Sequence, residues 1–149
     1  MPYSEEDKII RNYRPLVMPE TSSVALVAHH MRIRNASAVL AVAEDDEFVG
    51  IFTERDAINR VLADGRDPIQ TILSQVMTYN PVRVAPTTTA TEALQLMRSS
   101  GFRHLPVVEG SRVIGLISCG DFRKPEDGFD RNRSSASQAA AAPAVQNGS

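Results

Sequence analysis

The stretch VGIFTERD at residues 49–56 returns as IGLISCGD at residues 114–121. Each copy contains a short apolar run with a glycine, two further apolar residues, a hydroxyl residue, two spacers and an aspartate. The two hydroxyl residues are 65 positions apart, and so are the two aspartates. A pattern that repeats at a fixed distance predicts two copies of one supersecondary unit, packed together.

A helix of the same pattern precedes each copy. Apolar residues fall at i, i+3, i+4 and i+7 from Val24 and again from Ala90, which is the spacing of one helix face. The second helix opens on Thr89-x-x-Glu92, a capping box. A shift of 66 superposes the two helices, and we place the single-residue slip against the 65-residue period near Ala36.

Strands are expected on both sides of each helix. After the helix come two short runs rich in Val and Ile, joined by a polar segment, which predicts an antiparallel hairpin. The closing helix of the first half is expected over 54–63, and that of the second should be short because Pro125 follows after one turn. Between the halves, 67–77 predict a linking helix with Pro68 at its first position. The predicted hairpins are 39–42 with 48–52 and 105–108 with 113–117, and the strands before the helices are 16–18 and 82–85.

These elements predict an α+β fold of two β-α-β-β-α repeats. A half of about 55 residues buries little apolar surface alone. The halves are therefore expected to pack on each other about a pseudo-two-fold axis. The last stretch is rich in Ser and Ala, which favours disorder. The predicted divisions are an N-terminal extension at 1–11, a first repeat at 12–66, the linking helix at 67–77, a second repeat at 78–129 and a disordered tail at 130–149.

Composition narrows the class of protein. Of the 149 residues, 42% are hydrophobic and 23% are charged, which is ordinary for a globular protein. A formal net charge of −2 argues against broad binding to nucleic acid. No apolar run approaches the roughly 20 residues of a membrane helix, and the acidic start lacks the order of a secretion signal. The single Cys119 excludes an intrachain disulfide. We therefore expect a cytoplasmic protein with no nucleic-acid or membrane partner.

The duplicated pattern resembles a tandem pair of cystathionine-β-synthase-type domains, the CBS pair or Bateman module. The resemblance covers roughly residues 12–125. It implies two small sheets that face each other, association into a homodimer, and binding of an adenosine compound rather than catalysis. AMP, ADP or ATP is the implied ligand, with S-adenosylmethionine and NAD as alternatives, and a partner protein would be regulated. The stretches that carry it are VGIFTERD, IGLISCGD, FRHLPVVEG (102–110) and VMTYNPVRVAPTTTATEALQLM (76–97).

The hydroxyl–aspartate motif has two interpretations. Thr53-x-x-Asp56 and Ser118-x-x-Asp121 both match a capping box, which stabilises a helix start by about 1 kcal/mol. The same residues suit a ligand, because a carboxylate at this place accepts hydrogen bonds from a ribose diol and a helix N-terminus favours phosphate. The two roles can coexist.

Basic residues distinguish the halves. Arg103 and His104 precede the second hairpin, where the resemblance to the regulatory subunit of the AMP-activated protein kinase implies contact with nucleotide phosphates. Arginine is suited to bidentate phosphate contact. The alternative is that both are solvated residues at the edge of the strand. At the 65-residue shift, the first half has Ala38 and Val39 there. We expect the second half to hold the nucleotide, and the first to bind an uncharged adenosine group, a more weakly held nucleotide, or nothing. The candidate residues are Ser118, Asp121, Arg103 and His104 in the second half, and Thr53, Asp56 and Ala38 in the first.

Adenine is expected between the strand before each helix and the hairpin. Core or turn packing accounts equally well for each wall residue taken singly. The candidates are Thr78, Asn80, Pro81 and Val82 in the second half, and Leu16 and Val17 in the first.

No nucleophile–base arrangement, P-loop or metal-ligand spacing is present in the sequence, so we expect neither an enzyme nor a metal protein. The sequence predicts a stand-alone regulatory sensor that binds an adenosine nucleotide between its repeats and signals to a partner. The alternative is a ligand-free module for dimerisation or protein interaction, which the capping-box interpretation and the depleted first half support.

Overall fold

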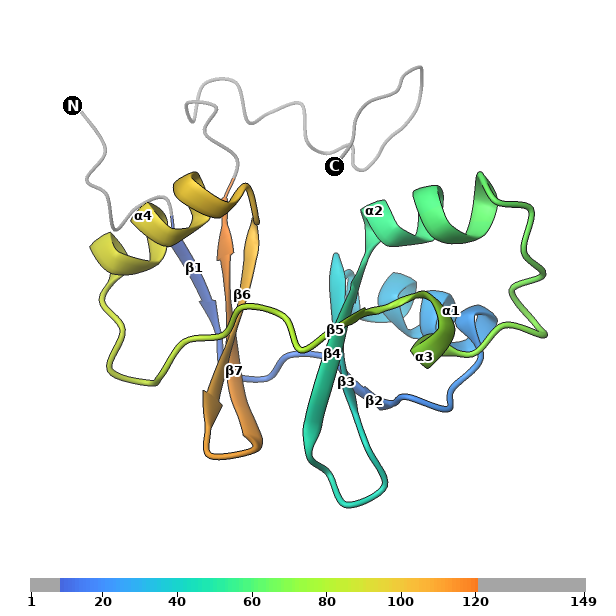
Figure 1. The fold of residues 1–149 in the computed structure, drawn as a ribbon, viewed down its shortest axis with the longest axis horizontal. Helices are drawn as coiled ribbons and strands as arrows, with labels where there is room; N and C mark the ends of the chain where they lie inside the picture. The colour runs from blue at the N-terminus through green and yellow to red at the C-terminus, as the bar shows by residue number, and fades with distance from the viewer. Residues whose placement is uncertain (1–8, 121–149) are drawn as a thin grey trace.

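Residues 9–120 are described by the computed structural model of the chain (Figure 1). Two sheets face each other, and helices cover their outer sides. The strand order is β2-β3-β4-β5 in the first sheet and β1-β7-β6 in the second. This is the α+β arrangement that the sequence predicts. The strands are β1 (Ile9–Asn12), β2 (Val17–Pro19), β3 (Ala38–Val42), β4 (Phe48–Thr53), β5 (Thr78–Tyr79), β6 (His104–Glu109) and β7 (Arg112–Cys119).

The helices lie where their apolar faces meet a sheet. α1 and α3 pack on the first sheet, and α4 packs on the second. The closing helix expected over 54–63 is present as α2 followed by a π-helical segment. No helix within residues 9–120 is long and apolar enough to cross a membrane. The bounds are α1 (Val24–Arg34), α2 (Glu54–Asp56), the π-helical η2 (Ala57–Leu62), α3 (Leu73–Val76) and α4 (Ala90–Ser100).

Both predicted hairpins form, and their pairing shows where the repeats differ in length. Val42 pairs with Phe48, six positions later, whereas Val108 pairs with Val113, five positions later. The extra residue therefore lies in the turn of the first hairpin, and its placement near Ala36 was wrong. A gapless comparison missed it because this turn is polar in both repeats and carries no packing constraint.

The corrected register changes which positions correspond. From α1 to β3 the offset to the second repeat is 66 residues, and it falls to 65 only in β4. Ala38 pairs with Thr53 as His104 pairs with Ser118. His104 therefore corresponds to Ala38, and Arg103 corresponds to the residue before it, Ser37.

Each repeat places its opening strand in the sheet of the other. β1 pairs with β7, and β5 pairs with β4. The motif glycines allow this close approach. A Cβ on Gly50 would stand 2.8 Å from the carbonyl oxygen of Thr78, and one on Gly115 would stand 3.1 Å from that of Asn12. The repeated glycine thus has a structural reason that the sequence comparison did not supply.

The two hairpins share a buried junction. Their facing sides form one apolar cluster. A second cluster lies between the first sheet and its helices, and a third lies between the second sheet and α4. Part of the core therefore lies between the halves, but the largest cluster lies between the first sheet and its helices, so the expectation that much of the core would lie at the junction holds only in part. The junction cluster consists of Ala38, Leu40, Phe48, Ile51, Val108 and Leu116.

The linking helix expected over 67–77 is helical only at Leu73–Val76. Its earlier carbonyl groups serve α1 instead. The N–H of Val24 donates to the carbonyl of Thr71 at 2.8 Å, and the N–H of Ala25 donates to that of Pro68 at 2.9 Å. These bonds satisfy N–H groups at the start of α1, and they compete with helical hydrogen bonds within the segment itself.

Of the two strands expected before the helices, only the first forms, as β2. In the second half, Val84 makes a single bridge to Val107. The closing helix of the second half and the Ser- and Ala-rich tail lie outside the described residues.

Candidate ligand-binding site

The first hydroxyl–aspartate motif stands where β4 ends and α2 begins. Thr53 is the N-cap: its Oγ1 accepts the N–H of Asp56 at 3.3 Å and donates to Oδ2 of Asp56 at 3.2 Å. The same Oδ2 accepts the N–H of Thr53 at 2.9 Å. These bonds satisfy groups that a helix start leaves without partners. The capping-box interpretation of this motif is confirmed.

Arg60 connects this motif to β5. Its Nε lies 3.6 Å from Oδ1 of Asp56, and its Nη1 donates to the carbonyls of Val76 at 3.2 Å and Met77 at 3.0 Å. Thr78, the first residue of β5, follows Met77 directly. A carboxylate offers about four acceptor positions, so Asp56 can still accept a hydrogen bond from a ligand hydroxyl through Oδ1.

His104 reaches the first repeat from the second. Its Nε2 lies 2.9 Å from Oγ of Ser37, the residue that precedes β3. The carbonyl of Ser37 accepts the N–H of Glu54, the first residue of α2, at 3.0 Å. The start of β6 and the start of α2 lie at the same end of the two sheets, uppermost in Figure 1. Ser37 therefore connects the imidazole of His104 to the start of α2 through two hydrogen bonds.

Two ionisable groups here have displaced pKa values. Burial, and then the charge of Arg103, lower the pKa of His104 below its ordinary 6.5, while the carboxylate of Asp56 opposes them. Burial raises the pKa of Glu54 above 4.5. Arg103 itself is exposed, with its carbonyl held by the N–H of Cys119 at 3.0 Å. The junction thus holds a permanent cation, a largely neutral imidazole and a carboxylate.

Only part of the second motif lies within the described residues. Ser118 is half-buried in β7, where it pairs with Ile10 on one side and His104 on the other. Asp121 lies outside the described residues. His104 therefore stands between the motifs: it is opposite Ser118 across the hairpin and hydrogen-bonded to Ser37 of the first repeat. The sequence pattern alone groups it with the second motif.

The predicted adenine wall of the second half lies in the segment that crosses between the sheets. Thr78 is half-buried and pairs with Ile51, so it belongs to the sheet of the first repeat. Asn80 has a left-handed backbone, with φ at 51°, and its Oδ1 accepts a hydrogen bond from Arg83 at 2.8 Å. Pro81 is half-buried and Val82 is partly exposed. The side chain of Val82 is thus open to a ligand, and that of Asn80 already has a partner.

Two of the first-half candidates are core residues in this structure. Leu16 packs in the cluster between the first sheet and its helices, and Ala38 packs in the junction cluster. Val17 is exposed on β2. A role in binding therefore remains a prediction for Val17, while Leu16 and Ala38 would act through their backbone groups.

Two residues of the site were missed from sequence. Ser37 could have been found at the 66-residue shift, which places it opposite Arg103. Arg60 could have been found from its spacing, because a cation four residues after Asp56 lies on the same helix face.

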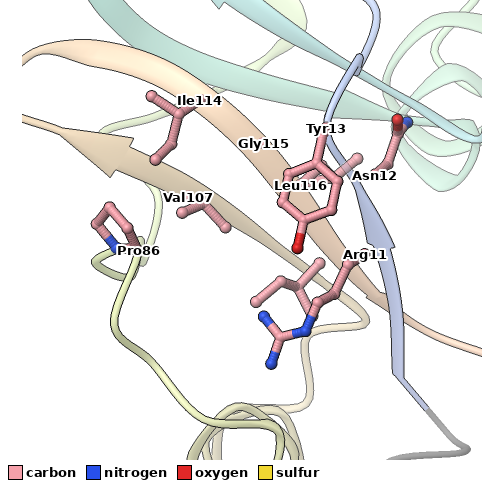
Figure 2. Close-up of a pocket in the computed structure, with 9 residues that line it drawn as sticks. Arg11, Asn12, Tyr13, Pro86, Val107, Ile114, Gly115 and Leu116 are labelled. Carbon is pink, nitrogen blue, oxygen red and sulfur yellow. The ribbon is translucent and has the colours of Figure 1, made fainter.

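A separate hollow lies on the second sheet (Figure 2). Tyr13 and Arg11 stand over one side, and Pro86, Val107 and Ile114 form the other. Its volume is about 60 Å³, well below the roughly 300–1,000 Å³ of a pocket for a drug-sized ligand. None of the predicted site residues lines it. This hollow is therefore not the candidate nucleotide site.

The geometry and the repeat agree with what comparison with known proteins finds. The CBS domain family model matches residues 9–63 and 73–125. The chain belongs to the CBS domain family and carries two such domains. It is similar to the CBS domain-containing protein CBSCBSPB3 of Arabidopsis thaliana, with 41% identity over 110 residues, which cover 74% of this chain and 20% of the relative. The chain thus spans about a fifth of the length of that relative.

Solved structures show the same fold. The CBS-domain containing protein ATU1752 of Agrobacterium tumefaciens is 31% identical, with a TM-score of 0.65 over 71% of this chain and 84% of that one. The CBS domain protein PAE2072 of Pyrobaculum aerophilum, solved in complex with AMP, is 25% identical, with a TM-score of 0.64 over 76% of this chain and 86% of that one. Within residues 9–120, no group of three or more His, Cys, Asp or Glu side chains could hold a metal ion.

Proposed function

We propose that this protein binds an adenosine nucleotide at the junction of its two repeats and signals the bound state to a partner protein. The observation that carries the proposal is that His104 of the second repeat is hydrogen-bonded to Ser37 of the first and lies within the influence of the Asp56 carboxylate. Arg103 adds a permanent cation for a phosphate, and the free acceptor capacity of Asp56 suits a ribose hydroxyl. A similar CBS domain protein complexed with AMP supports the choice of ligand.

Calorimetric titration of the full chain with AMP, ADP, ATP, S-adenosylmethionine and NAD tests the proposal. We expect one of them to bind below millimolar concentration and to raise the melting temperature by mass action. Asp56→Asn keeps the size of the side chain and should weaken binding about tenfold or more, which is the cost of one charge-assisted hydrogen bond. Asp64→Asn is the matched control, because Asp64 is exposed. Absence of binding by all five compounds would refute the proposal.

The second candidate, a ligand-free interaction module, is favoured by one specific observation. Asp56 is already used by Thr53 and Arg60, so the motif has a complete structural purpose without a ligand. This candidate predicts that Thr53→Ala lowers stability while no nucleotide changes the melting temperature.

Self-association is part of both candidates. Four large apolar side chains on α1 and η2 are exposed: Leu26, Ile33, Ile58 and Leu62. An exposed apolar patch is a common basis for an interface, and we propose a homodimer that covers these side chains. Sedimentation should show a dimer, which Leu62→Glu should dissociate and Leu62→Met should leave intact.

A further inference from the structure

His104 is held between charged groups of both repeats. Arg103 precedes it, just before β6, and the charge of Asp56 on α2 acts on it, while Arg60 on η2 partly neutralises that carboxylate. On the neighbouring strand β7 it faces the uncharged Ser118. Ser37 contacts its Nε2 from the start of β3. The described surroundings are therefore close to balanced in charge, and burial decides in favour of the neutral imidazole.

A bound phosphate would change this balance. A phosphate monoester carries nearly two negative charges at neutral pH, and an anion within about 4–6 Å favours the charged form of an imidazole. The phosphate would offset Arg103 and add its attraction to that of Asp56. His104 would then gain a proton from solvent, and its second ring nitrogen would become a donor.

We propose that His104 takes up a proton when a phosphate-bearing nucleotide binds at the repeat junction, and that Ser37 positions the imidazole for this step. The inference rests on the proposed function. The hydroxyl of Ser37 can donate to an unprotonated Nε2 and can accept from a protonated one, so it can hold the ring before and after the proton arrives. Nucleotide affinity would then increase as the pH falls from 8 to 7, whereas adenosine, which lacks phosphate, would bind independently of pH.

Proton uptake is measured directly by titrating the full chain with AMP at pH 7.5 in buffers that differ in ionisation enthalpy. We expect the wild type to take up a fraction of a proton, at most about one, and His104→Gln to take up less. The difference between the two proteins removes the contribution of the ligand's own titration. Adenosine should give no uptake with either protein.

The nitrogen chemical shifts of His104 in the wild type, with and without AMP, supply a second readout that needs no variant. Protonation should appear at both ring nitrogens on AMP addition at constant pH. Ser37→Ala should lower the uptake, Ser37→Thr should restore it, and Ser100→Ala, at an exposed serine of α4, should leave it unchanged.

The outcomes separate the two proposals. If AMP binds, wild type and His104→Gln take up equal amounts, and the ring nitrogens do not change, the proton inference is wrong and the proposed function stands. If no nucleotide binds at all, the proposed function fails and this inference fails with it.

Discussion

Arg60 donates from Nη1 to the carbonyl oxygen of Met77 at 3.0 Å, which ties the helix after the first motif to the strand that leads into the second repeat. We expect Arg60→Met to lower the free energy of unfolding by about 1 kcal/mol, because hydrogen bonds are lost while the aliphatic packing is kept. Urea denaturation measures the change. Arg66→Met, at an exposed arginine outside these bonds, is the control, and an equal loss in both variants would contradict the assignment.

The two motif glycines should differ in their tolerance of a methyl group. A Cβ on Gly50 would lie 2.7 Å from the sulfur of Met77 and 2.8 Å from the carbonyl oxygen of Thr78, whereas one on Gly115 meets nothing closer than 3.1 Å. Gly50→Ala should therefore destabilise the protein by about 1–3 kcal/mol, as overpacking does, and Gly115→Ala by less. Equal midpoints of thermal unfolding for the two variants would count against the close approach of β5 to β4.

The two capping boxes offer a way to separate stability from binding. Thr53→Ala and Thr89→Ala should each cost about 1 kcal/mol, because each removes an N-cap oxygen. Only Thr53 stands beside the candidate site, so only its replacement should also weaken AMP binding. Thr91→Ala, inside α4, should change neither quantity. Calorimetry and urea denaturation of the same three variants decide the matter.

The pH dependence of stability should carry the signature of His104. Its pKa is lowered in the folded state, so the unfolded chain binds more protons as the pH falls through 6.5. The free energy of unfolding should therefore decrease from pH 6.5 downward until the lowered pKa is passed, and then level off for this group. His104→Gln should remove that part of the dependence. An unchanged profile in this variant would show that the imidazole is not desolvated.

Glu54 should act with the opposite sign. Its pKa is raised in the folded state, so its contribution is lost as the pH rises from 4.5 through the raised value. Glu54→Gln should therefore make the protein relatively more stable at pH 7 than at pH 4. Glu44→Gln, at an exposed position, supplies the background, and the comparison of the two profiles isolates the carboxyl of Glu54.

Local patterns predicted the local structure well. The apolar spacing from Val24 and from Ala90, the polar turns, and the box at Thr53 and Asp56 each depend on neighbours within a few residues, and all are found. The prediction of the linking helix was wrong because of a long-range hydrogen bond: the carbonyl of Thr71 accepts the N–H of Val24 at the start of α1 rather than an N–H of its own segment. Propensity cannot foresee such a competition.

The candidate site was predicted in its residue types but not in its grouping. Arg103, His104 and Asp56 were all singled out, yet His104 was assigned to the second motif alone. One extra residue in the polar turn of the first hairpin shifted the comparison, so Ser37 was overlooked as the counterpart of Arg103. The exchange of opening strands was also out of reach, because a short strand carries no local sign of which sheet it will join.

That exchange has a consequence for how such a chain can arise. A single ancestral repeat could reach this arrangement only as a dimer, in which the opening strand of each molecule pairs in the sheet of the other. Duplication within one chain makes this strand exchange intramolecular, so the pairing of the two repeats no longer depends on protein concentration. It also releases the two copies from identity, and a histidine on one side can then face a serine on the other.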